Sequence, residues 1–354
     1  MRRTVSWSTA LLVCLPVAAL VTAVTRDLDK PDGLIDFRIY RLAGRAVLHG
    51  HSPYASPHSI LAHGPVGFVY PAPAAWAMAP FSLLPFPLAA VCFTLITTAA
   101  VVVTLYVLGV RDLRCYGIAF LMMPVSTAIT TGTVSTLIAC AAALVWRYRN
   151  SVLVPALALA AALMLKPLLW PLAIWFAATR RWRAAGLTAV VTGAGLLAGY
   201  AALHIDGLRS YPALVKATTT VEGRGSYSVY GLLSRLGLPA PLAGAYVIGA
   251  ALLVATWVLA RRDERLSFVA AIGATLALTP VMWVHYFTLL LIPLAFGSRR
   301  LSWWWAPAVV MWFVNAKPAD ASPASITLVW WLVLLTVAAL LAQRQRTATP
   351  AATA

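Results

Sequence analysis

Short arginine clusters recur along this chain and divide it into apolar runs. The clusters lie at residues 111/114, 147/149, 180/181/183, 261/262/265, 299/300 and 344/346. Basic residues that flank apolar runs in this way are typical of the cytoplasmic loops of membrane proteins. The intervals 115–146, 151–178 and 266–298 must then cross the membrane and return, and each has room for only two short helices. The pattern therefore predicts a series of helical hairpins.

The composition agrees with an integral membrane protein. Of the 354 residues, 61% are hydrophobic and 10% are charged, whereas a soluble domain has about 25% charged residues. The net charge of +17 lies in short clusters, so it does not indicate nucleic-acid binding. We expect an all-α polytopic membrane protein, with about 11–13 transmembrane or re-entrant helices in one domain over residues 1–342. Residues 343–354 are predicted to form a disordered cytoplasmic tail.

The middle of each predicted hairpin is polar or broken by proline. The three midpoints are residues 130–133, Lys166-Pro167 and residues 279–286, which include His285. Irregular backbone at membrane depth is tolerated only where it is buried in protein or lines a cavity. Three such midpoints predict a shared cavity that opens to the outside of the cell.

The segment that follows the first apolar run concentrates acidic residues. The run ends near Val24 and is long enough to remain as a membrane anchor, which places residues 26–67 outside the cell. Four of the ten acidic residues lie there, namely Asp27, Asp29, Asp32 and Asp36. On a helix, one side would carry the basic residues Arg38, Arg41, Arg45 and His49. Asp36 falls roughly opposite this row, so we expect an amphipathic external helix beside the membrane.

Two interpretations of Asp36 follow from the residues alone. Behind the turn Pro31-Asp32-Gly33, this aspartate suits the N-cap of the helix. A carboxylate held at the membrane surface also suits a general base.

Cationic side chains supply candidate anion-binding groups. Lys166 lies inside an apolar run, where an unpaired charge costs about 2.5–3.5 kcal/mol, so it needs a partner, water or an anionic ligand unless it snorkels to the interface. His285 beside its proline break suits either a ligand-binding or a core histidine. Arg209, Arg224 and Arg235 are either solvated loop residues or, together, an anion-binding collar.

Several common catalytic motifs are absent from the sequence. It contains no Gly-rich phosphate loop, HExxH pair, CxxC pair or GxSxG elbow. ATP-driven transport and zinc or serine hydrolysis are therefore poorly supported, and what remains suits a reaction on a lipid-linked phosphate. A lipid flippase or secondary transporter, which would show inverted repeats, and a structural scaffold are the alternatives.

The order of these pieces resembles glycosyltransferase family 87, membrane enzymes of the GT-C superfamily. The family includes polyprenyl-phosphate-mannose-dependent α-mannosyltransferases of actinobacteria and some arabinofuranosyltransferases. The similar segments are Asp36-Phe37-x-x-Tyr40, residues 43–50, Ser52-Pro53-Tyr54, Tyr70-Pro71-x-Pro73, Gly132, Leu165-Lys166-Pro167, residues 180–183, residues 228–235 and residues 279–286. Two positions depart from the family pattern, since Thr133 stands where a glutamine is common and Tyr286 where a second histidine is common.

The resemblance implies a GT-C-like bundle in a bacterial, actinobacterial plasma membrane, with an outward-facing site and Asp36 as the catalytic base. The implied reaction moves mannose, or arabinofuranose next, from a polyprenyl monophosphate donor to a glycolipid or polysaccharide acceptor with inversion. The residues expected at the donor phosphate or the substrate are Lys166, His285, Arg209, Arg224, Tyr40 and Tyr70. We expect no obligatory metal, no other cofactor and no nucleic-acid partner.

Overall fold

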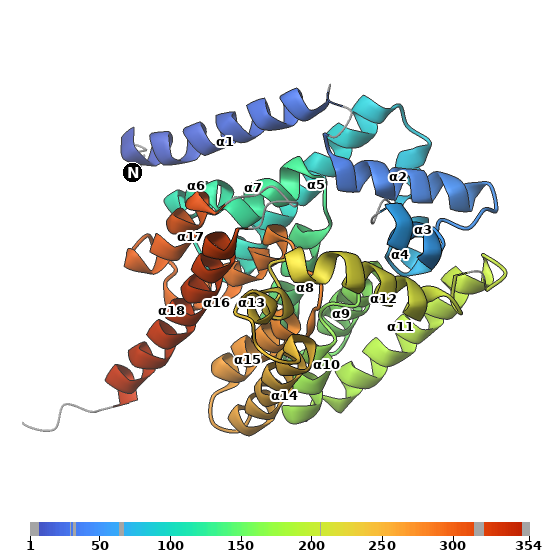
Figure 1. The fold of residues 1–354 in the computed structure, drawn as a ribbon. Helices are drawn as coiled ribbons and strands as arrows, with labels where there is room; N and C mark the ends of the chain where they lie inside the picture. Colours follow the sequence, from blue (N-terminus) through green and yellow to red (C-terminus); the bar gives the residue numbers. More distant parts are fainter. Residues whose placement is uncertain are drawn as a thin grey trace, which may run out of the picture.

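The computed structural model describes residues 7–28, 30, 33–63, 67–205, 207–314 and 322–348. Within these ranges the chain is helical throughout, with 18 α-helices, four short 3-10 helices and no β-strand (Figure 1). Five helices are long and apolar enough to cross a membrane: α1 (Trp7–Leu28), α5 (Phe86–Val107), α11 (Trp182–Ala201), α14 (Pro241–Leu259) and α18 (Pro323–Ala348). The predicted class, an all-α polytopic membrane protein, is confirmed.

The three predicted hairpins are present as short helices joined by irregular tips. The first comprises α6 (Leu113–Leu121), α7 (Met123–Thr130) and α8 (Ser135–Arg147), with a bend of 68° between α6 and α7. The second comprises α9 (Leu153–Leu165) and α10 (Pro171–Ala178). The third joins α15 (Glu264–Leu278) to η2 (Val284–Leu290) and α16 (Leu291–Gly297). We call the connecting residues 131–134, 166–170 and 279–283 the three tips; they fall where the sequence predicts breaks.

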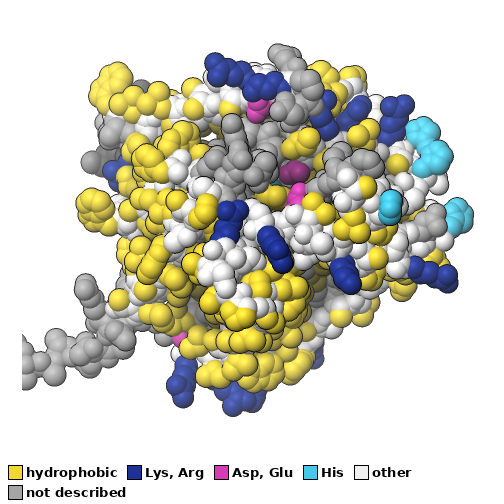
Figure 2. Space-filling model, in the orientation of Figure 1, with side chains coloured by type: hydrophobic (Ala, Val, Ile, Leu, Met, Phe, Trp, Pro, Cys, Tyr) yellow, Lys and Arg dark blue, Asp and Glu magenta, His cyan; other side chains and the backbone are white. Residues whose placement is uncertain are grey.

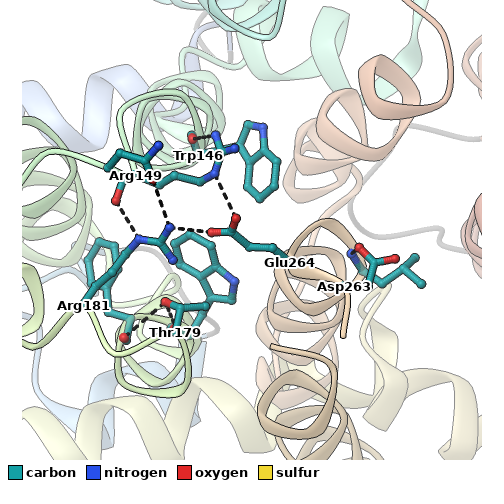
Figure 3. Close-up of polar contacts among 10 residues, drawn as sticks. Trp146, Arg149, Thr179, Arg181, Asp263 and Glu264 are labelled. Carbon is teal, nitrogen blue, oxygen red and sulfur yellow. Dashed lines mark hydrogen bonds and ion pairs between the residues drawn. The ribbon is translucent and has the colours of Figure 1, made fainter. Parts of the chain in front are cut away.

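The arginine clusters that bracket these hairpins meet at one end of the bundle. Glu264, at the start of α15, lies 3.3 Å from Arg149 Nε and 2.6 Å from Arg181 Nη2 (Figure 3). Arg181 Nε also donates to the Arg149 carbonyl at 2.6 Å. A pocket nearby is bordered by Trp146 with Arg265, Arg299 and Arg300. Basic side chains are visible at this end, beneath α14, in Figure 2. We call this region the arginine end.

The structure also defines the helices of two further segments. Residues 70–110 form two helices, the short α4 (Ala72–Ser82) and the span α5, with Pro85 as the N-cap of α5. The stretch between α11 and α14, which carries Arg209, Arg224 and Arg235, is mostly helical and contains α12 (Tyr211–Glu222), η1 (Gly223–Gly225) and α13 (Val229–Arg235).

The C-terminal part follows the third hairpin. It contains η3 (Trp303–Trp305), α17 (Ala306–Val310), η4 (Met311–Phe313) and α18. Residues 315–321 lie outside the described residues. Of the predicted tail, residues 349–354 are also outside them, whereas α18 continues through residue 343 to Ala348.

The amphipathic helix that the sequence predicts is α2 (Ile35–Leu48). It is followed by the short α3 (Pro57–His63). The buried face of α2, which packs against α4, consists of Phe37, Tyr40, Ala43, Gly44 and Val47. A Cβ atom at Gly44 would lie 2.7 Å from the Met78 backbone, so only glycine permits this close approach.

The arginine row of α2 serves local structure. Arg41 donates to the Phe81 and Leu84 carbonyls at 3.3 and 2.7 Å, where α4 ends. Arg38 donates to the Gly33 carbonyl at 2.8 Å, and its guanidinium lies 4.0 Å from the centre of the Phe86 ring. Both arginines therefore fix the position of α2 through neighbouring backbone.

Candidate active site

The first turn of α2 is docked on the tip of the first hairpin. The backbone N–H groups of Asp36 and Phe37 donate to the Thr131 carbonyl at 3.0 and 3.4 Å. Gly132 has a φ of +71°, and a Cβ there would lie 2.6 Å from the Phe37 Cβ, so the turn requires glycine on both conformational and steric grounds. The first backbone N–H groups of α2 have no acceptor within the helix, and they thus donate to a segment that is distant in the sequence.

The N-cap interpretation of Asp36 is wrong. The helix begins at Ile35, the N-cap position belongs to Leu34 with a φ of 50°, and that residue makes no capping hydrogen bond through its side chain. Asp36 is the second residue of the helix, so its side chain does not cap the helix.

A cavity of about 520 Å³ lies where the three tips meet α2 and α12. All three tips contribute to its wall, through Thr131, through Lys166 with Pro167, and through residues 279–281 and 283. The described residues therefore confirm that the tips share a cavity. The sequence-predicted residues in the wall are Asp36, Tyr70, Lys166 and His285. Figure 2 shows acidic side chains in a hollow on this face of the molecule.

Lys166 is held between aromatic rings. Its Nζ donates to the Tyr286 hydroxyl, and it lies 3.8 Å from the centre of that ring and 4.9 Å from the centre of the Tyr70 ring. Cation–π contacts of this kind stabilise an ammonium without neutralising it. No carboxylate of the described residues lies within 4.0 Å of Nζ. The lysine lines the cavity, where its ammonium can meet an anionic ligand.

Asp36 is partly buried in the same wall. Burial raises the pKa of its carboxyl to about 6, while the positive charge of Lys166 opposes that rise. A carboxyl with this pKa is largely ionised near neutral pH and can accept a proton. It therefore has the properties of a general base.

Tyr40 is buried and is not part of the cavity wall. Its hydroxyl is 3.4 Å from the Thr133 Oγ1, and its ring centre is 5.0 Å from that of Tyr70. Tyr70 reaches the cavity itself. Tyr40 thus joins α2 to the first tip, and Tyr70 presents the aromatic surface.

His285 is 4% exposed, and its ring centre lies 4.8 Å from that of Tyr286. Tyr286 is one of the two departures from the family pattern, and it is the residue that holds Lys166. The other departure, Thr133, bonds Tyr40.

The structure does not bring the predicted arginine collar to the cavity. Arg209, Arg224 and Arg235 are exposed, and none is part of the cavity wall. Among the other acids of the first loop, Asp27 is ion-paired with Lys30 at 2.8 Å, and Asp29 and Asp32 lie outside the described residues.

Glu222 is a cavity residue that the sequence interpretation missed. It ends α12 and lines the same cavity as Asp36. Burial raises the pKa of its carboxyl to about 7, and the negative charge of Asp36 adds to the rise. The signal was the spacing of residues 211, 215, 218 and 222, which places them on one helix face.

An all-helical membrane bundle with charged and aromatic side chains around one cavity defines an integral membrane enzyme or transporter. Residues 68–284 match the sequence profile of glycosyltransferase family 87, and the protein belongs to this family. It is therefore a membrane glycosyltransferase. The matched residues include Lys166 and Glu222, start after Asp36 and end one residue before His285. No curated protein and no solved structure matches the chain.

Proposed function

We propose that this glycosyltransferase moves a sugar from a polyprenyl monophosphate to a glycolipid or glycan acceptor, with inversion at the anomeric carbon. Mannose is the first candidate sugar and arabinofuranose the second. The observation that carries the proposal is the convergence of Asp36, Lys166 and His285 on one cavity from three separate elements. A base, a cation and a histidine in one site suit the displacement of a phosphate by a hydroxyl.

Asp36 is assigned the role of general base. Its carboxylate takes the proton of the acceptor hydroxyl while the hydroxyl oxygen forms a bond to the anomeric carbon of the donor. The bond between that carbon and the phosphate oxygen breaks, and its electron pair leaves with the phosphate. A single displacement inverts the configuration, so a β-linked donor gives an α-linked product.

Lys166 and His285 are assigned to the leaving phosphate. The ammonium is preorganised by Tyr70 and Tyr286, and no ion pair with a described carboxylate competes for it. Charge-assisted hydrogen bonds aimed at the developing charge are an effective way to stabilise a leaving phosphate.

The donor lipid tail is placed in a groove beside the cavity. A second pocket, of about 450 Å³, lies between α1 and the α6–α7 pair and is lined by apolar residues including Leu20, Phe120 and Met123. Thr127 and Thr131 border both this groove and the cavity. A tail lying there would deliver its phosphate beside Asp36 and Lys166.

The proposed location is the plasma membrane, with the cavity facing outside. Residues 26–67, 205–240 and 315–323 would be external, and the arginine clusters at 147, 180, 261 and 299 cytoplasmic. Cysteine labelling of intact cells tests this, in a background with Cys14, Cys92, Cys115 and Cys140 replaced. External labelling near Arg180 would overturn the hairpin scheme.

The reaction is tested with purified protein in liposomes. Radiolabelled polyprenyl-phosphate mannose and polyprenyl-phosphate arabinofuranose are supplied separately with extracted membrane glycolipids, and the labelled product is identified. Transfer by the wild type and its loss in Asp36→Asn support the proposal. Movement of donor across the bilayer without any product would show a flippase instead.

A further inference from the structure

One face of α12 borders the cavity along the length of the helix. Its contributing residues are Tyr211, Val215, Thr218, Thr219 and Glu222. Steps of three and four residues place them on a single helical face. The face is aromatic and apolar at its beginning and polar at its end, where Glu222 closes the helix.

The polar end of this face is fixed against the third tip. Gly223 is buried, and a Cβ there would lie 2.5 Å from the Tyr230 ring and 3.3 Å from the Pro280 carbonyl oxygen. A little further on, the Tyr227 N–H donates to the Met282 carbonyl at 2.7 Å. Glu222 therefore extends from a rigid anchor, and its position in the cavity wall is set before any ligand arrives.

The charges around Glu222 discriminate between ligands. In the described part of the chain, the Glu222 carboxyl has no ion pair, and the negative charge of Asp36 acts on it. A phosphate beside Glu222 would be repelled by this carboxylate and by Asp36, and no described cation is paired with Glu222 to offset the repulsion. Neutral hydroxyl groups can donate hydrogen bonds to a carboxylate, so a polyhydroxylated ligand suits this side of the cavity.

We propose that the cavity-facing side of α12 is the acceptor subsite and that Glu222 binds hydroxyl groups of the acceptor sugar. The inference rests on the proposed sugar transfer and specifies which wall receives the acceptor. Lys166, on the second tip, then holds the donor phosphate, and Asp36 lies between the two substrates. Glu222 is a binding residue in this arrangement and moves no proton.

The test measures equilibrium binding of two tritiated probes to the full-length protein in nanodiscs. Octyl α-mannopyranoside is the neutral glycoside and decaprenyl phosphate is the anionic lipid. Glu222→Ala should weaken glycoside binding by about tenfold or more, because a hydrogen bond to a charged group is lost. Glu222→Gln keeps an accepting oxygen and should weaken it by about threefold to tenfold. Decaprenyl phosphate binding should stay within about twofold of wild type in both variants.

Adjacent threonines on α12 provide a matched control. Thr219 lines the cavity and Thr220 is exposed outside it, and each hydroxyl donates to the carbonyl four residues earlier, at 2.8 and 2.9 Å. Thr219→Val should weaken glycoside binding by about twofold to fivefold, whereas Thr220→Val should not change it. Each change removes the same type of hydrogen bond within the helix, so a difference between them reports the cavity.

The remaining outcomes separate the two proposals. Unchanged glycoside binding in Glu222→Ala, or an equal loss of decaprenyl phosphate binding, overturns the subsite. A wild-type protein that binds neither octyl mannoside nor octyl arabinofuranoside overturns it as well. In transfer assays the acceptor KM of Glu222→Gln should rise while kcat is largely kept. If the wild type binds both probes but transfers no sugar, the proposed function fails while the binding result still decides the role of Glu222.

Discussion

The carboxylates at the two ends of this protein differ in their ion pairs and in the direction of their pKa shifts. At the arginine end, Glu264 lies between Arg149 and Arg181 (Figure 3). Near this end, the hydrogen bonds from Arg114 hold the pKa of Asp112 at about 2. In the cavity, burial raises the pKa of Asp36 to about 6 and that of Glu222 to about 7. Neither cavity carboxylate has an ion pair within the described ranges.

The carboxylates at the arginine end hold helices together, whereas the carboxylates in the cavity remain available to a ligand. At the arginine end, Glu264 connects α15 to the α8–α9 and α10–α11 turns through its ion pairs, and Asp112 accepts a hydrogen bond from the Leu301 N–H at 3.0 Å. The cavity carboxylates join no elements through ion pairs within the described residues. Side-chain hydrogen bonds link Asp36 to Thr131 and Thr133, and backbone contacts at residues 131 and 282 fix the segments that carry the two carboxylates. Buried carboxylates without a cationic partner destabilise a fold, and such groups persist where function requires them.

The largest expected effect follows from neutralising the cavity base. Asp36→Asn keeps the shape of the side chain but cannot accept the proton, so transfer should fall by about 10²–10⁴-fold. The thermal unfolding temperature should stay near that of wild type. The control is Asp112→Asn, which removes a carboxylate ion-paired to Arg114 outside the cavity and the groove and should leave transfer per folded molecule unchanged. Near-normal sugar transfer by Asp36→Asn would contradict the role of Asp36 as the general base.

The next effect concerns the cation that faces these carboxylates. Lys166→Met should weaken donor use by about 10–100-fold, since a charged hydrogen bond to phosphate is lost. Donor KM and expression level are the measurements. Lys216→Met changes an exposed lysine of α12 and serves as the control. A silent Lys166→Met would show that Lys166 binds no donor, and loss of folded protein would show a structural role.

The pH profile sharpens the comparison further. Asp36 acts in its ionised form, and its raised pKa of about 6 means that protonation removes the base as the pH falls through that value. kcat/KM should therefore fall by about tenfold per pH unit below 6 and level off above it. Other titratable groups around the cavity are Glu222, Lys166, His285, Tyr70 and Tyr286. Because the pKa of Glu222 is about 7, this carboxyl is mostly protonated near pH 6, so Glu222→Gln should leave the midpoint close to that of the wild type, and a large displacement would contradict its assignment to Asp36.

The smallest effect on transfer is expected at the opposite end. Glu264→Gln leaves Arg149 and Arg181 without their shared carboxylate and should cost about 1–2 kcal/mol of stability, because these side chains are only partly exposed. Thermal unfolding in detergent measures the loss. Transfer per folded molecule should match wild type. A defect in transfer without a lower unfolding temperature would show that the two ends are not separable in function.

The sequence predicts the broad arrangement because membrane constraints are local. Arginine clusters and proline breaks define the hairpins and their tips, and the tips share a cavity with Asp36, Lys166 and His285. The requirement that irregular backbone line a cavity holds for each hairpin separately, so it can be applied without knowing their packing.

The details that escaped prediction depend on contacts between distant segments. The N-cap interpretation of Asp36 fails because the Thr131 carbonyl, far along the chain, receives the first amides of α2. The arginine collar is absent from the cavity because the external segment folds as helices that turn Glu222 inward and leave Arg209 and Arg224 exposed. Glu222 was overlooked because its segment was interpreted as a loop, where helical spacing has no meaning.

The backbone contacts between tips and helices bear on how this enzyme can evolve. Asp36, Thr131 and Tyr227 hold the architecture through main-chain atoms, and the same residues line the cavity. A main-chain hydrogen bond is available to almost any residue, so a change at Thr131 can alter the lining while its carbonyl still accepts from α2. Tyr227 is different, because its side chain is 1% exposed and packs in the core. Position 131 is therefore the natural starting point for a library that seeks new glycosidic products.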